Sequence, residues 1–111
     1  MQNSFGLQNS LKAIKGKGSQ LTGLLLKASE VLKSVSGCRL YMISTDSEDD
    51  DLIWVTEVWD TKEDHAASLQ DVRIRSIIGE AMPLLDGMPT GGKSLKVLGG
   101  LGLQPPGDVG Q

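Results

Sequence analysis

The sequence predicts a one-domain α+β fold whose six elements follow the order β-α-β-β-α-β. Three observations support this order. Short segments alternate apolar with polar side chains, which is typical of strands. Two longer segments repeat apolar residues at spacings of three and four, which is typical of helices with one buried face. Glycine, proline and acidic clusters separate these segments and predict the turns between them.

The first strand is predicted over residues 5–14. Alternation places Asn9 on the same face as four apolar residues: Phe5, Leu7, Leu11 and Ala13. A turn of glycines and lysines follows, and Ser19 is the expected N-cap of the first helix. Apolar residues recur along that helix over residues 21–35, and Gly37 is expected to end it.

The second and third strands are predicted over residues 38–44 and 52–59. The acidic loop of residues 45–51 between them has the length of a hairpin connection, so the two strands should be antiparallel. Strict alternation along the second strand puts Cys38 on the opposite face from Tyr41.

Helical periodicity returns at Lys62 and weakens over residues 69–73, where we expect a kink or break. It then continues until Pro83 and Gly87 terminate it. Residues 94–98 alternate again and are the predicted fourth strand.

This order is the split βαβ, or ferredoxin-like, plan, in which a four-stranded antiparallel sheet has both helices on one face. Residues 1–100 are expected to form this domain, and residues 101–111 a Gly/Pro-rich C-terminal tail with loose order. The other sheet face would carry Trp54 and Val58 and would be bare in a monomer. A second copy is the simplest cover for a bare apolar face, so we predict a homodimer.

Composition limits the classes of partner and cofactor. The net charge of -3 and the pI near 5.0 argue against nucleic-acid binding. No apolar run approaches the roughly 20 residues of a membrane helix, so no membrane partner is expected. The single cysteine, Cys38, excludes an intrachain disulfide and predicts a reducing, cytoplasmic location. The acidic loop lacks the spacing of a calcium loop and no phosphate-binding loop is found, so we expect neither metal nor cofactor.

The most informative segment covers residues 53–65, because it holds both tryptophans and the only histidine. Strand alternation places Glu57 and Trp59 on one face. Thr61, with an acidic residue three positions later, matches the start of a helix. His65 then falls in the first helical turn, where it should lean back over the strand end.

A site is predicted at this corner, between the sheet and the helices. Histidine is chemically suited to general-base catalysis, and a buried Glu57 would have a raised pKa, so His65 and Glu57 are the candidate general bases. Trp59 is expected to stack on an aromatic substrate. The other predicted substrate-binding residues are Val55, Asn9 and Leu7. Structural roles are alternatives: Trp59 as core packing, His65 as a half-exposed helix start, and Glu57 as the ion-pair partner of Arg39 or a lysine.

A further pattern spans nearly the whole chain, from about residue 5 to residue 100. Its specific part is Ile53-Trp54-Val55-Thr56-Glu57-Val58-Trp59, continued by Lys62-Glu63-Asp64-His65. Flanking parts are Ser36-Gly37-Cys38 with Tyr41 and Ser44, then Ser68-Leu69, then Ala81-Met82-Pro83-Leu84. In these segments the chain resembles the antibiotic biosynthesis monooxygenase family, which includes quinol monooxygenase-like proteins.

The resemblance implies a dimeric α+β barrel, with two sheets packed face to face and a pocket between sheet and helices in each subunit. Enzymes of the family oxidise polycyclic phenols or quinols with dioxygen, typically without metal, haem or flavin. A polyketide oxygenase among them has a pocket Trp at the position of Trp59, a Tyr at that of His65, and an Asn near Val55. Haem-degrading relatives use an Asn on the first strand, where this chain has Asn9.

The predicted function is therefore that of a cofactor-independent monooxygenase acting on a small aromatic substrate, a quinol or polycyclic phenol. A non-catalytic dimeric protein that binds a small ligand or serves a stress response on the same fold is the alternative. Haem binding is a third reading, for which His65 would be the available axial ligand.

Overall fold

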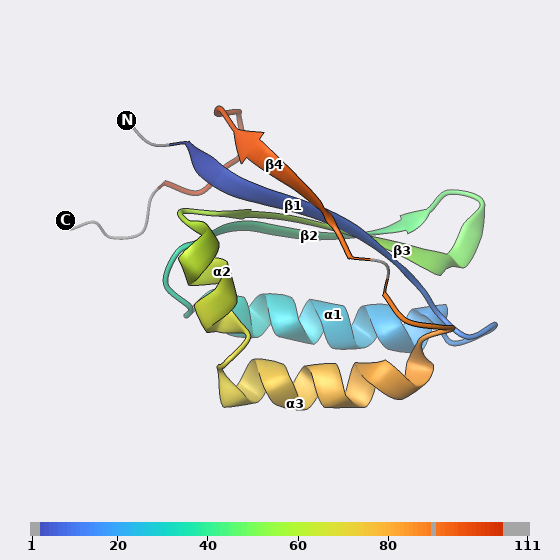
Figure 1. Cartoon of the computed structure of the whole chain (residues 1–111). Coiled ribbons are helices and arrows are strands. Elements are labelled where there is room, and N and C mark those ends of the chain that lie inside the picture. Colours follow the sequence, from blue (N-terminus) through green and yellow to red (C-terminus); the bar gives the residue numbers. More distant parts are fainter. Residues whose placement is uncertain (1–2, 90, 106–111) are drawn as a thin grey trace.

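The computed structural model describes residues 3–89 and 91–105, and this part of the chain has the predicted element order. The strands form one antiparallel sheet in the order β2-β3-β1-β4, and α1 and α3 cover one face of it (Figure 1). The elements are β1 (Ser4–Lys12), α1 (Gly18–Leu32), β2 (Cys38–Asp46), β3 (Asp49–Trp59), α2 (Lys62–Ser68), α3 (Val72–Ala81), the 3-10 turn η1 (Met82–Leu84) and β4 (Lys93–Val97). The ferredoxin-like α+β fold is confirmed.

The core lies between the sheet and the helices and contains two groups of buried side chains. In the first group, Ile53 and Val55 of β3 pack with Leu21 of α1. In the second, Trp59 at the end of β3 packs with Ile74 of α3 and other helical residues. The odd-numbered residues of β3 therefore face the helices, as alternation predicted.

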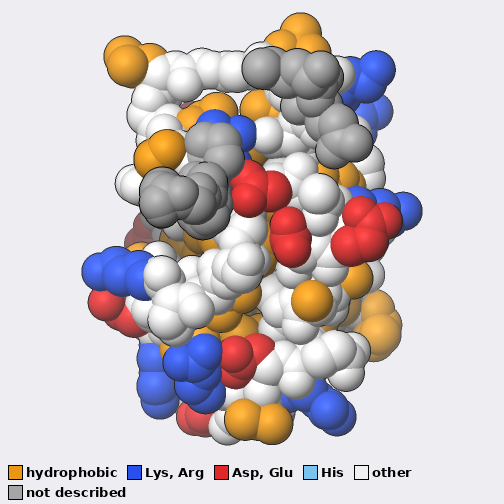
Figure 2. Space-filling model, turned by 90° about the vertical axis from the view of Figure 1, so that its left-hand side faces the viewer, with side chains coloured by type: hydrophobic (Ala, Val, Ile, Leu, Met, Phe, Trp, Pro, Cys, Tyr) orange, Lys and Arg blue, Asp and Glu red, His pale blue; other side chains and the backbone are white. Residues whose placement is uncertain are grey.

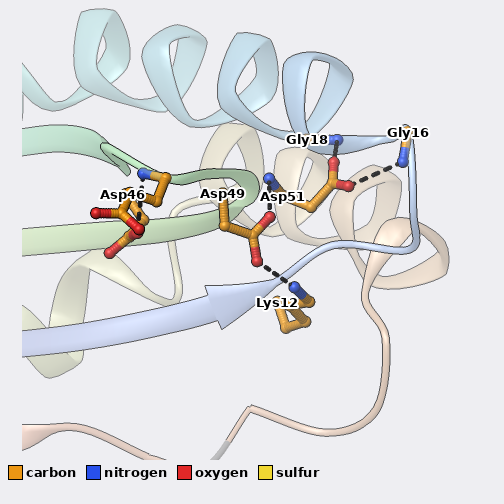
Figure 3. Close-up of polar contacts among 7 residues, drawn as sticks. Lys12, Gly16, Gly18, Asp46, Asp49 and Asp51 are labelled. Atoms are coloured by element: carbon orange, nitrogen blue, oxygen red, sulfur yellow. Dashed lines mark hydrogen bonds and ion pairs between the residues drawn. The ribbon is translucent and has the colours of Figure 1, made fainter.

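The start of α1 is fixed by a carboxylate from another element (Figure 3). Asp51 of β3 accepts hydrogen bonds from the backbone N–H groups of Gly16, at 3.0 Å, and Gly18, at 2.8 Å. These donors have no partner inside the helix, and the dipole of α1 favours a negative charge there. The prediction that Ser19 is the N-cap is wrong, because the helix begins at Gly18 and its N-cap residue, Lys17, forms no side-chain cap.

The β2–β3 hairpin is longer than predicted. Both strands run through most of the acidic segment 45–51, since β2 ends at Asp46 and β3 begins at Asp49. The Asp46 carboxylate accepts from the backbone N–H of Glu48 across the turn, and Asp49 pairs with Lys12 of β1 (Figure 3). Two of the acidic side chains that indicated a loop thus have partners in the folded hairpin: one in the turn itself and one on the neighbouring strand.

A β-bulge near the start of β2 changes the orientation of one predicted residue. Cys38 pairs with Trp59 and Leu40 pairs with Val58, which leaves Arg39 as the extra residue. Because of this insertion Cys38 shares the helix-covered face with Tyr41, and the two belong to the same packed group. The prediction that they face opposite ways is wrong.

The second helical segment is broken as predicted. Residues 69–71 separate α2 from α3, and the carboxylate of Asp71 caps α3 by accepting from the backbone N–H of Arg73 at 2.8 Å. The predicted start of α2 is also confirmed, because the Thr61 hydroxyl accepts from the backbone N–H of Asp64 at 3.0 Å.

Other boundaries shift by a few residues. The first helix ends at Leu32, before Gly37, whose φ of +91° turns the chain into β2. Within the predicted tail 101–111, the backbone N–H of Gln104 donates to the carbonyl of Arg39 at 3.1 Å, and residues 106–111 lie outside the described part of the chain.

The sheet face opposite the helices is partly apolar and partly exposed. Trp54 is 38% exposed, Met42 49% and Leu95 41%. Val58, in contrast, is only 6% exposed, so the expectation that it needs a second chain for cover is wrong.

The end of the molecule beside α2 carries acidic and basic side chains mixed with small apolar areas (Figure 2). Over residues 3–89 and 91–105, the helices are too short or too polar to cross a membrane.

Candidate functional site

The candidate site lies where β3 ends and α2 begins. The register of the sheet places Leu7 of β1 and Tyr41 of β2 on either side of Glu57. Likewise, Phe5 of β1 and Cys38 of β2 lie on either side of Trp59. All of these positions face the helices, so one carboxylate sits within a wall of aromatic and apolar side chains.

The capped start of α2 brings His65 back over the strand end, as the sequence predicted. Its ring lies edge-on to Trp59, with ring centroids 5.6 Å apart, and 5.8 Å from the ring of Phe5. The imidazole Nε2 is 3.7 Å from Oε1 of Glu57. Glu57, Trp59 and His65 therefore form one cluster.

Glu57 is nearly enclosed, with 8% of its surface exposed. The indole N–H of Trp59 donates to its Oε1 at 2.9 Å. Burial raises the pKa of Glu57 above the ordinary value of glutamate, while the hydrogen bond from Trp59 and the proximity of His65 oppose that rise.

The alternative in which Arg39 pairs with Glu57 is not what the structure shows. The Arg39 side chain donates to the hydroxyl of Ser4 and to the carbonyl of Gln104, and lies 3.9 Å from Asp60.

The remaining predicted residues occupy the same face but differ in surroundings. Val55 is buried in the first core group. Asn9 pairs with Val55 across the strands, and its Oδ1 is buried with no hydrogen-bond partner among the described residues. The backbone at Gly92 approaches Asn9 so closely that a Cβ there would overlap the Asn9 amide and lie 2.9 Å from Leu7 Cδ1. The segment before β4 thus passes directly over Asn9 and Leu7.

Tyr41 and Cys38 are site neighbours that the sequence reasoning did not select. Burial and the nearby charge of Glu57 raise the pKa of the Tyr41 phenol, and the same two causes raise the pKa of the Cys38 thiol to about 11. Their proximity depends on the register of β2 against β3 and on the bulge at Arg39. The only sequence signal for Tyr41 was its place in the family pattern.

A groove of about 1230 Å³ follows the outer edge of β2, between that strand and the C-terminal part of α1. It includes Tyr41 and Cys38 but none of the six predicted site residues. Within residues 3–89 and 91–105, no three His, Cys, Asp or Glu side chains gather in a way that would hold a metal ion.

Solved structures of similar shape include a candidate antibiotic biosynthesis monooxygenase from Chloroflexus aurantiacus. It is 31% identical, matches over 90% of this chain and 98% of that chain, and has a TM-score of 0.81. Similarly named proteins from Nitrosomonas europaea (12% identity, 88% and 93% coverage, TM-score 0.82) and Caulobacter crescentus (17%, 88% and 92%, 0.78) share the fold. No functionally curated protein shows a significant match.

The family model for antibiotic biosynthesis monooxygenase matches residues 4–78, which include β1 to α2 and most of α3. This match covers the whole cluster of Glu57, Trp59 and His65. Together with the Chloroflexus structure, it shows that the chain belongs to the antibiotic biosynthesis monooxygenase family.

Proposed function

We propose that the protein is a cofactor-independent monooxygenase that oxidises a quinol or polycyclic phenol with dioxygen. The observation that carries the proposal is the buried carboxylate of Glu57, held by Trp59 and facing His65 among aromatic side chains. Family membership supports the reaction class. A base with a raised pKa in a dry, aromatic-lined corner suits the deprotonation of a phenol.

In the proposed reaction Glu57 accepts the phenolic proton, directly or through His65. The resulting phenolate is electron-rich enough to reduce dioxygen, so the substrate supplies the electrons. For a ring CH₂ group activated by the phenol, CH₂ and O₂ become C=O and H₂O, which balances atoms and electrons. Trp59, which is 1% exposed, would hold the Glu57 carboxylate in place through its indole N–H, and exclusion of water would keep the anion reactive.

Asn9, Leu7 and Val55 have the proposed role of shaping the substrate-binding side. The buried Oδ1 of Asn9 lacks a donor within the described chain, and a substrate hydroxyl could supply one. Leu7 and Val55 would contribute apolar wall on the same sheet face as Glu57.

We also propose that two copies associate through the sheet face that bears Trp54 and Met42. These large apolar side chains are exposed in the single chain, and α1 and α3 lie on the opposite face (Figure 1). Burial of such a surface contributes about 25 cal/mol per Å².

The test is oxygen uptake with a panel of quinols and anthrones, using Glu57→Gln, His65→Ala and the surface control Glu63→Gln. The wild type and the control should consume oxygen with the same kcat/KM. Loss of the base should lower turnover by about 10²-fold. If no member of the panel stimulates oxygen uptake, the proposed reaction is wrong; if both site variants keep full activity, the assigned base is wrong.

The second candidate is a non-catalytic protein that binds a small ligand on the same fold. The observation in its favour is that Oε1 of Glu57 already accepts a hydrogen bond from the Trp59 indole. This bond opposes the rise in the pKa of Glu57 and so makes the carboxylate a weaker base. Quenching of tryptophan fluorescence by quinols without oxygen consumption would support this candidate over the enzyme.

A further inference from the structure

The helices do not cover the sheet evenly. Helix α1 packs on β2 and β3, and α2 packs on β3, whereas β4 packs mainly on β1. β4 also forms one edge of the sheet and lies away from α1 and α3 (Figure 1). The helix side of β4 is therefore open, and Ser94 and Lys96 of this strand are both exposed.

Two glycines show which residues of β4 share a face with the candidate site. A Cβ on Gly92 would lie 2.9 Å from Cδ1 of Leu7, so position 92 points to the helix side. A Cβ on Gly6 would lie 3.2 Å from Cβ of Leu95, so position 95 points to the opposite side. Because alternate residues of a strand share a face, Lys96 lies on the helix side with the site.

The register places Lys96 in one row with the aromatic part of the site. Lys96 pairs with Phe5, and Phe5 pairs with Trp59. The ring of His65 lies 5.8 Å from the ring of Phe5. Neighbouring strands are about 4.8 Å apart, so Lys96 is roughly 10 Å from Trp59 across the sheet. A ligand that lies over Phe5 would therefore have an ammonium group at one end and Glu57 near the other.

The charge of Lys96 is available to a ligand. The ion pairs among the described residues all involve other side chains. Ser94 adds a hydroxyl on the same face, and an ammonium beside a hydroxyl is suited to bind a carboxylate. A lysine on an edge strand also discourages pairing with other chains, but Lys93 on the opposite face of β4 already meets that need.

We propose that Lys96 and Ser94 form an anion-binding subsite at the β4 edge of the candidate site, which holds the carboxylate of a phenolic acid while its hydroxyl faces Glu57. The ligand then enters from β4 and passes over Phe5 and Leu7, which are half-buried. That the hydroxyl is afterwards oxidised rests on the proposed function. Binding of the carboxylate does not, because it follows from the residues of β4 and their register.

The first test measures binding without catalysis. His65 is the only histidine of the chain, so its ring C–H signals in NMR report a ligand beside Phe5. The probes are 4-hydroxybenzoate and its neutral amide, 4-hydroxybenzamide, titrated into the full chain at a single neutral pH. Both should shift the His65 signals, and 4-hydroxybenzoate should bind more tightly.

Three variants assign the preference to the subsite. Lys96→Gln should weaken binding of 4-hydroxybenzoate about three- to fivefold, the scale of an exposed charge pair, and leave the amide unaffected. Lys96→Arg keeps the charge and should retain the preference. Lys93→Gln removes a lysine from the opposite face of the same strand and should change neither probe. Equal losses in Lys96→Gln and Lys93→Gln, no preference for 4-hydroxybenzoate, or no shift of the His65 signals would overturn the proposal.

The second test separates the subsite from the proposed reaction. With 2,5-dihydroxybenzoate, a quinol that carries a carboxylate, Lys96→Gln should raise KM about three- to fivefold and leave kcat unchanged, because Lys96 holds a group remote from the reacting atoms. With the methyl ester of this quinol, KM should be the same in the variant and the wild type. An unchanged KM for the acid in an active enzyme would contradict the subsite and leave the reaction standing. The expected binding pattern without any oxygen uptake would contradict the reaction and support the subsite.

Discussion

At the scale of single residues, three proton-carrying groups meet at one point of the sheet. Burial raises the pKa of Glu57, Tyr41 and Cys38, and the charge of Glu57 raises the pKa of the other two further. The thiol at about 11 and the phenol therefore stay protonated at neutral pH. This leaves Glu57, with His65 beside it, as the group that can accept a proton from a substrate.

The raised pKa of Glu57 predicts how stability changes with pH. A carboxyl whose pKa is raised by folding contributes stability that is fully present below its unfolded pKa, and that contribution is lost as pH rises through the folded value. Glu57→Gln does not titrate. Its free energy of unfolding should therefore equal that of the wild type near pH 4 and exceed it increasingly at higher pH.

Urea unfolding at pH 4, 6 and 8 would measure this difference. Glu63→Gln on the exposed side of α2 is the matched control and should show no such trend. If the variant's advantage in free energy of unfolding shrinks as pH rises, the folded protein stabilises the charged carboxylate. That outcome would contradict a raised pKa for Glu57.

Asn9 allows a second prediction at this scale. A buried oxygen without a donor is unfavourable, so Asn9→Leu should raise the free energy of unfolding by about 1 kcal/mol while it weakens substrate binding. Gln8→Leu, on the neighbouring exposed position, should change stability by less than about 0.5 kcal/mol. Chemical denaturation without ligand measures both; a marked loss of stability in Asn9→Leu would show that the amide has a structural role.

At the scale of elements, local patterns were predictable and long-range contacts were not. The alternation of β3, the Thr61 cap and the break between α2 and α3 all depend on neighbours within a few residues. The start of α1 depends on Asp51, more than thirty residues away, and so Ser19 was chosen wrongly. The bulge at Arg39 likewise became visible only when β2 was paired with β3.

The cap supplied by Asp51 leads to a prediction for α1. Asp51→Ala leaves two backbone donors of the helix start without their partner and should lower the free energy of unfolding by about 1–2 kcal/mol. Asp50→Ala removes the same charge from the adjacent, exposed residue and should have little effect. Thermal or urea unfolding of the two variants would decide; equal losses would mean that charge alone, rather than the bonds, stabilises this end of α1.

At the scale of the whole molecule, the sequence predicted the cluster of the candidate site but not the groove along β2. Glu57, Trp59 and His65 come from one continuous segment, so alternation and a helix start were enough to bring them together. The groove is built from α1, β2 and the segment after β4, and its lining follows from the packing of elements distant in sequence. Val58 shows the same limit, because its burial within one chain could not be read from its position in the strand.

The exposed face of the sheet leads to a prediction about dimer formation. The wild type should sediment as a dimer at micromolar concentration, and Trp54→Lys should shift it to monomer by placing a charge in the proposed interface. Leu26→Lys exchanges an exposed apolar residue of α1 for the same charge and should leave the dimer intact. A monomeric wild type, or a dimer that survives Trp54→Lys and dissociates with Leu26→Lys, would rule out this face.

The two faces of β3 have a consequence for how the family can diversify. Odd positions such as Glu57 and Trp59 face the helices, whereas even positions such as Trp54 face the opposite side. Deleting one residue between Ile53 and Glu57 would exchange the two sets, so that the proposed base and the proposed interface would be displaced in one event. Substitution along this strand can therefore alter one face at a time, whereas a change in its length alters both faces unless a bulge absorbs it, as the bulge at Arg39 does in β2.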